Sequence, residues 1–139
     1  AGILSMKPLP EESPDFLNKM VAVNLGGPVN IMHAALPQMK KQGGGVVVNV
    51  ASQAAKVTFP GMNLATYSAT KAGVLRLTQV LAAETKEDNI RHYAVLPGGT
   101  ATDMTNQQGM PAEKVGQRIL DAAQETLGLE SGQDSEIYQ

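Results

Sequence analysis

The sequence contains no cysteine and no tryptophan, and aromatic residues occupy only 4% of its 139 positions. Without cysteine the chain cannot form disulfides, zinc–thiolate centres or cysteine nucleophiles. Few aromatic side chains argue against a stacking platform for single-stranded nucleic acid. Eleven basic and thirteen acidic residues give a formal net charge of −2. We therefore expect no basic surface for nucleic acid or for an anionic membrane.

The sequence also lacks a long apolar run of the roughly 18 or more residues that would predict a membrane span. Its N-terminus carries no charged-then-apolar signal segment, so a cytoplasmic location is the default expectation. The length, with 42% hydrophobic and 17% charged residues, is typical of one globular domain. The chain begins with Ala1 rather than Met, which is compatible with a processed protein or with part of a longer one.

Helix-like and strand-like patterns alternate along the chain. Helices are predicted at 15–42, 64–86 and 111–127, and strands at 46–50, 90–96 and 135–138. Ser13-Pro14 predicts the start of the first helix, and Gly26-Gly27-Pro28 a break within it. The β-branched run 46–50 predicts a strand buried on both faces, as in a parallel sheet. The alternation predicts an α/β fold with a parallel sheet covered by helices.

Two features that resemble ligand sites have simpler interpretations. Gly43-Gly44-Gly45 follows a helix and precedes a strand, the reverse of a phosphate-binding loop, so we interpret it as a turn. No GxGxxG is present. His33 and His92 have no partners at metal-ligand spacing, so both are expected to be structural, and no metal site is predicted.

Tyr67 and Lys71 are four positions apart in a predicted helix, which places them on one face. A tyrosine has a pKa near ~10 and is a poor base at neutral pH, but a neighbouring cation can lower that pKa by about 1–3. The spacing alone is common by chance and is more typical of a surface pair than of a catalytic one. The surroundings of the pair favour a functional site, because Ser52 follows strand 46–50 and the turn 97–104 follows the next strand. Both lie where α/β sheets bind ligands.

Taken in order, these residues resemble the motifs of the classical short-chain dehydrogenase/reductase family. The motifs are Val23-Asn24-Leu25, Leu36-Pro37-Gln38-Met39, Asn49-Val50-Ala51-Ser52, Tyr67-x-x-x-Lys71 and Pro97-Gly98-x-x-x-Thr102. The match runs from Ala1 to about Met104. The resemblance implies a Rossmann-type fold and an NAD(P)-dependent oxidoreductase that interconverts a small-molecule carbonyl and alcohol. It also implies NAD or NADP as cofactor and a homodimer or homotetramer.

The resemblance further assigns roles to single residues. Tyr67 would be the catalytic acid/base, and Lys71 would lower its pKa and bind the nicotinamide ribose. Ser52 would orient the substrate, and Asn24 would hold a water that links Lys71 to solvent. The cofactor-binding residues implied are Gly2, Tyr67, Lys71, Pro97, Gly98, Thr100 and Thr102.

Pro28 bears on the expected role of Asn24. In an α-helix the amide of residue 28 would bond to the carbonyl of residue 24. Proline has no amide hydrogen, so we expect the Asn24 carbonyl to be free to bind the relay water.

The sequence also departs from the family pattern. The family's TGxxxGxG segment is missing, and Ala1-Gly2 resembles only the end of its Asn-Asn-Ala-Gly motif. We therefore interpret 1–139 as the C-terminal catalytic portion of a single Rossmann domain without its N-terminal phosphate-binding half. Strand 46–50 would then have an unpaired edge, and the chain alone is expected to associate or fold poorly and to bind NAD(H) or NADP(H) weakly. Arg91-His92-Tyr93 stands where members of the family commonly have Arg-Val-Asn, so the packing there is expected to differ.

A different class of function stays open: a non-catalytic binding or scaffold protein of this family, or an inactive fragment. The intact catalytic residues favour the enzyme, and the missing phosphate loop favours the alternative. In the enzyme, specificity is expected to come from the stretch between Ser52 and Tyr67 and from the loop after Met104. Apolar residues such as Phe59 and Met62 there predict a small or medium uncharged substrate.

Overall fold

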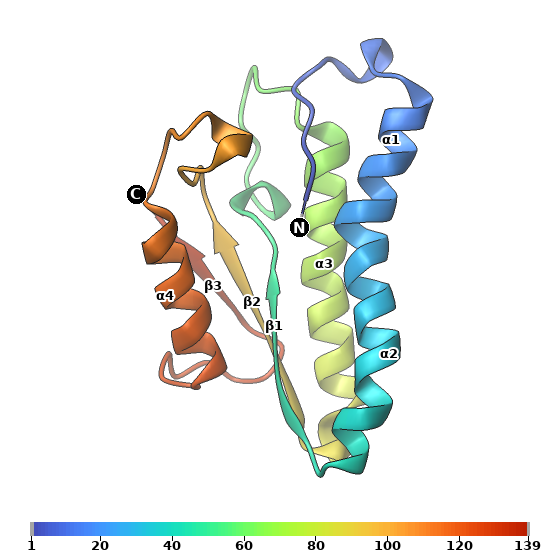
Figure 1. The fold of residues 1–139 in the computed structure, drawn as a ribbon, viewed down its shortest axis with the longest axis vertical. Helices are drawn as coiled ribbons and strands as arrows, with labels where there is room; N and C mark the ends of the chain where they lie inside the picture. The colour runs from blue at the N-terminus through green and yellow to red at the C-terminus, as the bar shows by residue number, and fades with distance from the viewer. Residues whose placement is uncertain (1, 139) are drawn as a thin grey trace.

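The computed structural model describes residues 2–138, which form a parallel sheet with helices on both faces (Figure 1). The strands are β1 (Gly45–Val50), β2 (Ile90–Pro97) and β3 (Asp134–Ile137), in the order β1-β2-β3. Gly45 pairs with Ile90, and Ala94 pairs with Asp134. The predicted α/β fold with a parallel sheet is confirmed.

The helices divide between the two faces of the sheet (Figure 1). They are α1 (Pro14–Val21), α2 (Gly27–Lys41), α3 (Ala65–Glu84) and α4 (Ala112–Ala123). On one face, α3 and α2 contribute Leu81 and Met32 to a core shared with Val47 of β1. On the other face, α4 contributes Val115 to a core shared with Val95 of β2. Every helix thus buries one side, as its apolar pattern predicts.

The local signals act as predicted at the first helix and at the glycine turn. The Phe16 N–H donates to Ser13 Oγ over 3.2 Å, which caps α1 where Pro14 begins it. The Gly43–Gly45 turn joins α2 to β1 at positive φ angles. At Gly44 a Cβ atom would stand 2.3 Å from the Asn89 carbonyl oxygen, so only glycine fits there.

One prediction about burial was wrong. β1 is not buried on both faces: Val47 is buried, but Val50 is 42% exposed. The more deeply buried strand is β2, where Ala94, Val95 and Leu96 are all 0% exposed. The reason is position, because within residues 2–138 β1 pairs only with β2 and forms the edge of the sheet. The expected free edge of this strand is therefore present.

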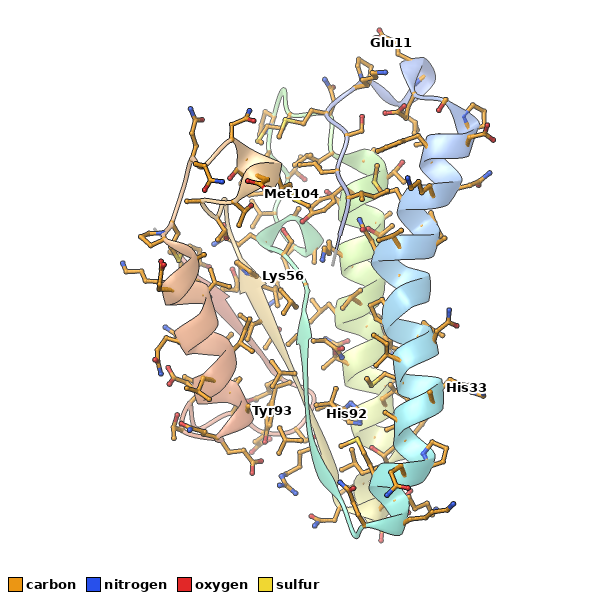
Figure 2. All side chains as sticks on the ribbon, in the orientation of Figure 1. Glu11, His33, Lys56, His92, Tyr93 and Met104 are labelled. Atoms are coloured by element: carbon orange, nitrogen blue, oxygen red, sulfur yellow. The ribbon has the colours of Figure 1, made fainter. Side chains whose placement is uncertain are left out.

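The unusual Arg91-His92-Tyr93 run is accommodated by contacts on both faces of β2 (Figure 2). Arg91 forms an ion pair with Glu125, and the Tyr93 hydroxyl donates to the same carboxylate over 2.7 Å. On the opposite face His92 is completely buried, with Nε2 3.1 Å from Thr85 Oγ1. This run thus ties β2 both to the turn after α4 and to the end of α3.

The surroundings of His92 favour the neutral imidazole. Thr85 Oγ1 donates to the Leu81 carbonyl over 2.7 Å, which favours the tautomer in which His92 Nε2 is the donor in their contact. Nδ1 then carries no proton, and it has no partner. Burial lowers the pKa of the His92 imidazole below its ordinary 6.5. A second proton would be a buried, unpaired donor and charge.

This predicts an acid-sensitive fold. Below about pH 6.5 the unfolded chain takes up a proton that folded His92 resists, so the free energy of unfolding should fall by up to about 1.4 kcal/mol per pH unit. This loss of stability extends over the pH range between the ordinary pKa of histidine and the lowered pKa of His92. In His92→Val this contribution should vanish, which urea unfolding at pH 7.5 and at lower pH values measures. His33→Gln, a change at the exposed histidine of α2, is the control. Equal pH dependence in His92→Val and the parent would contradict the prediction.

Candidate active site

The predicted site residues gather at the carboxyl end of the sheet. The N-terminal segment, the loop after β1 and the loop after β2 all lie at this end, next to the first turns of α3 (Figure 1). Ser52 follows β1, Pro97 ends β2, and Tyr67 and Lys71 lie near the start of α3. Parallel strands place their carboxyl ends together, which is why residues distant in sequence meet here.

Asn24 lies on a π-helical turn, Ala22–Gly26, that joins α1 to α2. The Gly27 N–H donates to the Ala22 carbonyl, so the α-helical pattern is interrupted just before Pro28. The predicted break is thus a π turn rather than an end of the helix. Water binding at the Asn24 carbonyl stays a prediction.

The Asn24 side chain, which is 1% exposed, binds the N-terminal segment. Its Oδ1 accepts from the Ile3 N–H over 2.8 Å, and its Nδ2 donates to the Ile3 carbonyl over 2.9 Å. Nδ2 also lies 3.3 Å from Thr70 Oγ1 on α3. One amide therefore fixes residue 3 against two helices, a role that the sequence analysis did not identify.

Gly2 brings the N-terminal segment close to Lys71. A Cβ atom at Gly2 would stand 3.5 Å from Asn24 Oδ1 and 3.9 Å from Lys71 Nζ. The missing side chain leaves space beside the ammonium group. Ala1, the other residue of the predicted motif, lies outside the described residues.

Lys71 is buried, and its ammonium group binds the end of β1. Nζ donates to the Val50 carbonyl over 3.1 Å and lies 5.8 Å from the centre of the Tyr67 ring. Burial lowers the pKa of Lys71 below its ordinary 10.5. The predicted Tyr67–Lys71 pair is therefore brought together on one face of α3.

Lys71 was expected to lower the pKa of the Tyr67 phenol, but in the structure this pKa is raised. Burial raises the pKa of the Tyr67 phenol above its ordinary 10, and the neighbouring Ser52 hydroxyl acts in the opposite direction with a smaller effect. The resemblance implied a pKa lowered by Lys71. Loss of water around the phenol outweighs the cation, whose nearest acceptor is the Val50 carbonyl. With these neighbours the Tyr67 phenol keeps its proton at neutral pH.

Ser52 has two roles in the structure. Its Oγ accepts from the Ala54 N–H over 3.2 Å and so caps the short helical turn Gln53–Ala55. The same hydroxyl reaches the Tyr67 phenol. One hydroxyl therefore both caps the turn and lowers the pKa of the neighbouring phenol.

The turn after β2 holds Thr100 and Thr102 through its own hydrogen bonds. Thr100 Oγ1 donates to the Gly98 carbonyl over 3.1 Å. Thr102 caps the short turn Asp103–Thr105, and the Thr102 N–H donates to Thr105 Oγ1 over 3.2 Å. Thr102 is exposed, and its hydroxyl donates to the Thr100 carbonyl over 3.4 Å.

Gln53 is a further residue of this end of the sheet that the sequence analysis missed. A Cβ atom on Gly98 would stand 2.8 Å from Gln53 Oε1, so the turn after β2 packs directly on this side chain. Gln53 Nε2 donates to the Ile137 carbonyl at the end of β3 over 2.9 Å. Gln53 thereby links the ends of all three described strands. Its only sequence signal is its place beside Ser52.

Within residues 2–138 neither a metal-binding cluster nor a membrane-spanning helix is found. No group of three or more histidine, aspartate or glutamate side chains is arranged to hold a metal ion. None of the helices described combines the length and the hydropathy needed to cross a bilayer.

Comparisons with known proteins agree with this geometry. A family model described as short chain dehydrogenase matches residues 1–112. The chain is 42% identical over 103 residues to an uncharacterized oxidoreductase of Thermotoga maritima, covering 74% of this chain and 40% of that protein. It is 36% identical over 130 residues to human (3R)-3-hydroxyacyl-CoA dehydrogenase, covering 93% of this chain and 46% of that protein. The chain thus spans less than half the length of these two relatives.

A solved structure extends the comparison to the fold. A 3-oxoacyl-[acyl-carrier protein] reductase of Brucella melitensis with bound NAD superposes with a TM-score of 0.85 at 30% identity. The superposition covers 99% of this chain and 58% of that one.

Proposed function

Because the chain belongs to the short-chain dehydrogenase family, we propose that it is the catalytic portion of an NAD(P)-dependent oxidoreductase that interconverts a carbonyl and an alcohol. The observation that carries the proposal is the cluster at the start of α3. There the Ser52 and Tyr67 hydroxyls, the Lys71 ammonium and the buried Asn24 amide come together from three separate segments.

The surroundings of Lys71 suit a nicotinamide nucleotide. Lys71 Nζ would bind the ribose, since Gly2 places no side chain beside it, and Pro97, Gly98, Thr100 and Thr102 form a turn at the same end of the sheet. A nicotinamide held there supplies or accepts a hydride. We propose that residues outside this chain hold the diphosphate, since no glycine-rich loop opens a helix here. Solved relatives contain NAD or NADP.

The chain's own residues then move the proton. In the direction of reduction, Tyr67 donates its phenolic proton to the carbonyl oxygen as the hydride reaches the carbonyl carbon, which leaves an alcohol and a phenolate. Ser52 donates a hydrogen bond to the same oxygen and aligns it. The Lys71 ammonium, 5.8 Å from the Tyr67 ring centre, stabilises the phenolate that forms. Asn24 fixes the N-terminal segment over the site and, through its carbonyl, orders a water for reprotonation.

A turnover assay tests the proposal against the alternative of a non-catalytic binding or scaffold protein. The assay uses a protein in which a glycine-rich phosphate-binding segment precedes this chain, a panel of ketones and alcohols, and both nicotinamide cofactors. Oxidation or reduction of the cofactor that depends on the substrate supports the enzyme. A folded protein that binds the cofactor but turns over no member of the panel supports the alternative.

We also propose that the protein is a homodimer or homotetramer. Val29 and Ile31 on α2 are 41% and 63% exposed, which leaves apolar surface uncovered on a helix that packs beside α3. A second copy of the chain would cover it. Light scattering at micromolar concentration tests this, and a monomeric mass would count against it.

A further inference from the structure

A large cleft opens between the N-terminal segment and the loop after β2, next to the catalytic cluster. Its volume is about 960 Å³, within the range of small-molecule sites. Its lining comes from three separate stretches of the chain: residues 2–16, the loop before α3, and residues 99–109. The side chains that matter most for its chemistry are Met6, Phe16, Met62, Asp103 and Met104.

Three of the seven methionines of the chain meet in this cleft. Met6, Met62 and Met104 are 49%, 38% and 42% exposed, whereas the core methionines Met20 and Met32 are buried. An exposed methionine on each of three loops is not explained by core packing. Unbranched and polarizable, methionine adapts its shape to a flexible apolar ligand.

Met104 connects the cleft to the catalytic residues. Its Cε lies 3.9 Å from the position of a Cβ on Gly2, and that position is itself 3.9 Å from Lys71 Nζ. Figure 2 shows Met104 between its short helical turn and the N-terminal segment. Ser5 and Lys7, on either side of Met6, line a separate narrow pocket against Tyr67, together with Glu12. A molecule in the cleft therefore lies next to the residues that adjoin Lys71, the neighbour of the proposed proton donor.

The charges around the cleft exclude one class of ligand. Of the residues that the structure describes, no lysine or arginine lines this cleft, and the one charged side chain is the Asp103 carboxylate. A carboxylate or phosphate on the part of the ligand that the cleft holds would meet a like charge, and no lysine or arginine among the lining residues would replace its hydration.

We propose that the substrate is an uncharged ketone or secondary alcohol with a flexible, unbranched apolar chain, which Met6, Met62 and Met104 bind. This inference rests on the proposed function for the reacting carbonyl. The apolar chain lies in the cleft, and its length determines the affinity. Each methylene buried adds roughly three- to fourfold in affinity.

The test measures binding without turnover, on the intact protein with isotope-labelled methionine methyl groups assigned by single Met→Leu variants. Unbranched methyl ketones from butanone to decanone are titrated, followed by a keto acid of matching length. The methyl signals of Met6, Met62 and Met104 should shift and those of Met20 and Met32 should not. Affinity should rise roughly three- to fourfold per methylene until the cleft is filled, and the keto acid should bind at least about tenfold more weakly.

A matched pair of variants controls the assignment. Met62 and Val57 are 38% and 43% exposed on the same loop, but only Met62 lines the cleft. Met62→Ser should weaken binding of the longest ketone roughly tenfold, and Val57→Ser should leave it unchanged. Equal binding of ketone and keto acid, no dependence on chain length, or equal effects of the two variants would overturn the proposal. Methyl shifts without turnover would retain this inference and remove the proposed function, and turnover without methyl shifts would do the opposite.

Discussion

In Tyr67→Phe, kcat is expected to fall by about 10²–10⁴-fold while the fold is retained. The substitution removes one oxygen and leaves the ring packed at the start of α3, so the loss falls on proton transfer rather than on structure. Since burial raises the pKa of the phenol, the parent enzyme should reduce ketones at a rate independent of pH through neutrality. The rate should decline only when the pH rises above ~10 and the phenol loses the proton that it must donate.

The control for this variant is Tyr93→Phe. Tyr93 is also largely buried, and its hydroxyl donates to Glu125, on the face of the sheet that α4 covers. That change should cost about 1 kcal/mol of stability and little activity. Steady-state kinetics of both variants, with circular dichroism to check the fold, make the comparison. Normal turnover in Tyr67→Phe would show that another group donates the proton.

In Asn24→Leu the free energy of unfolding is expected to fall by about 1–3 kcal/mol, and activity should fall with it. The leucine has a similar volume but leaves both the N–H and the carbonyl of Ile3 without the partners that Asn24 provides at 2.8 and 2.9 Å. The N-terminal segment should then separate from the π turn. Because Gly2 adjoins Lys71, the proposed catalytic residues would lose their contact with the N-terminal segment.

Two measurements check this prediction. Urea unfolding gives the change in stability, and hydrogen exchange at the Ile3 amide reports on the segment itself, where protection should be lost. Asn30→Leu, at an exposed asparagine of α2, is the matched control and should change neither quantity appreciably. Unchanged exchange at Ile3 in Asn24→Leu would mean that other contacts hold the segment.

The start of the first helix, the pairing of Tyr67 with Lys71 and the type of sheet could be predicted from the amino-acid sequence alone. Ser13 followed by Pro14 begins a helix because a hydroxyl cap and a preset φ act within one turn. The four-residue spacing of Tyr67 and Lys71 places both on one face of α3, since helical geometry repeats every 3.6 residues. The parallel sheet follows from strands that alternate with helices. Each of these depends on neighbours in the chain, so the amino-acid sequence was sufficient.

Other features depended on groups that only folding brings together. Asn24 binds Ile3, 21 positions away, and Gln53 binds Ile137, 84 positions away; neither pairing has a local signal. Burial, which is a property of the whole fold, determined that the Tyr67 pKa is raised although a lysine lies one helical turn away. The same holds for β1, whose β-branched residues suit an interior strand but lie at a sheet edge. The spacing of residues in the sequence determines which groups can come together on one helix. Desolvation and long-range contacts determine the pKa values and the hydrogen-bond partners of those groups.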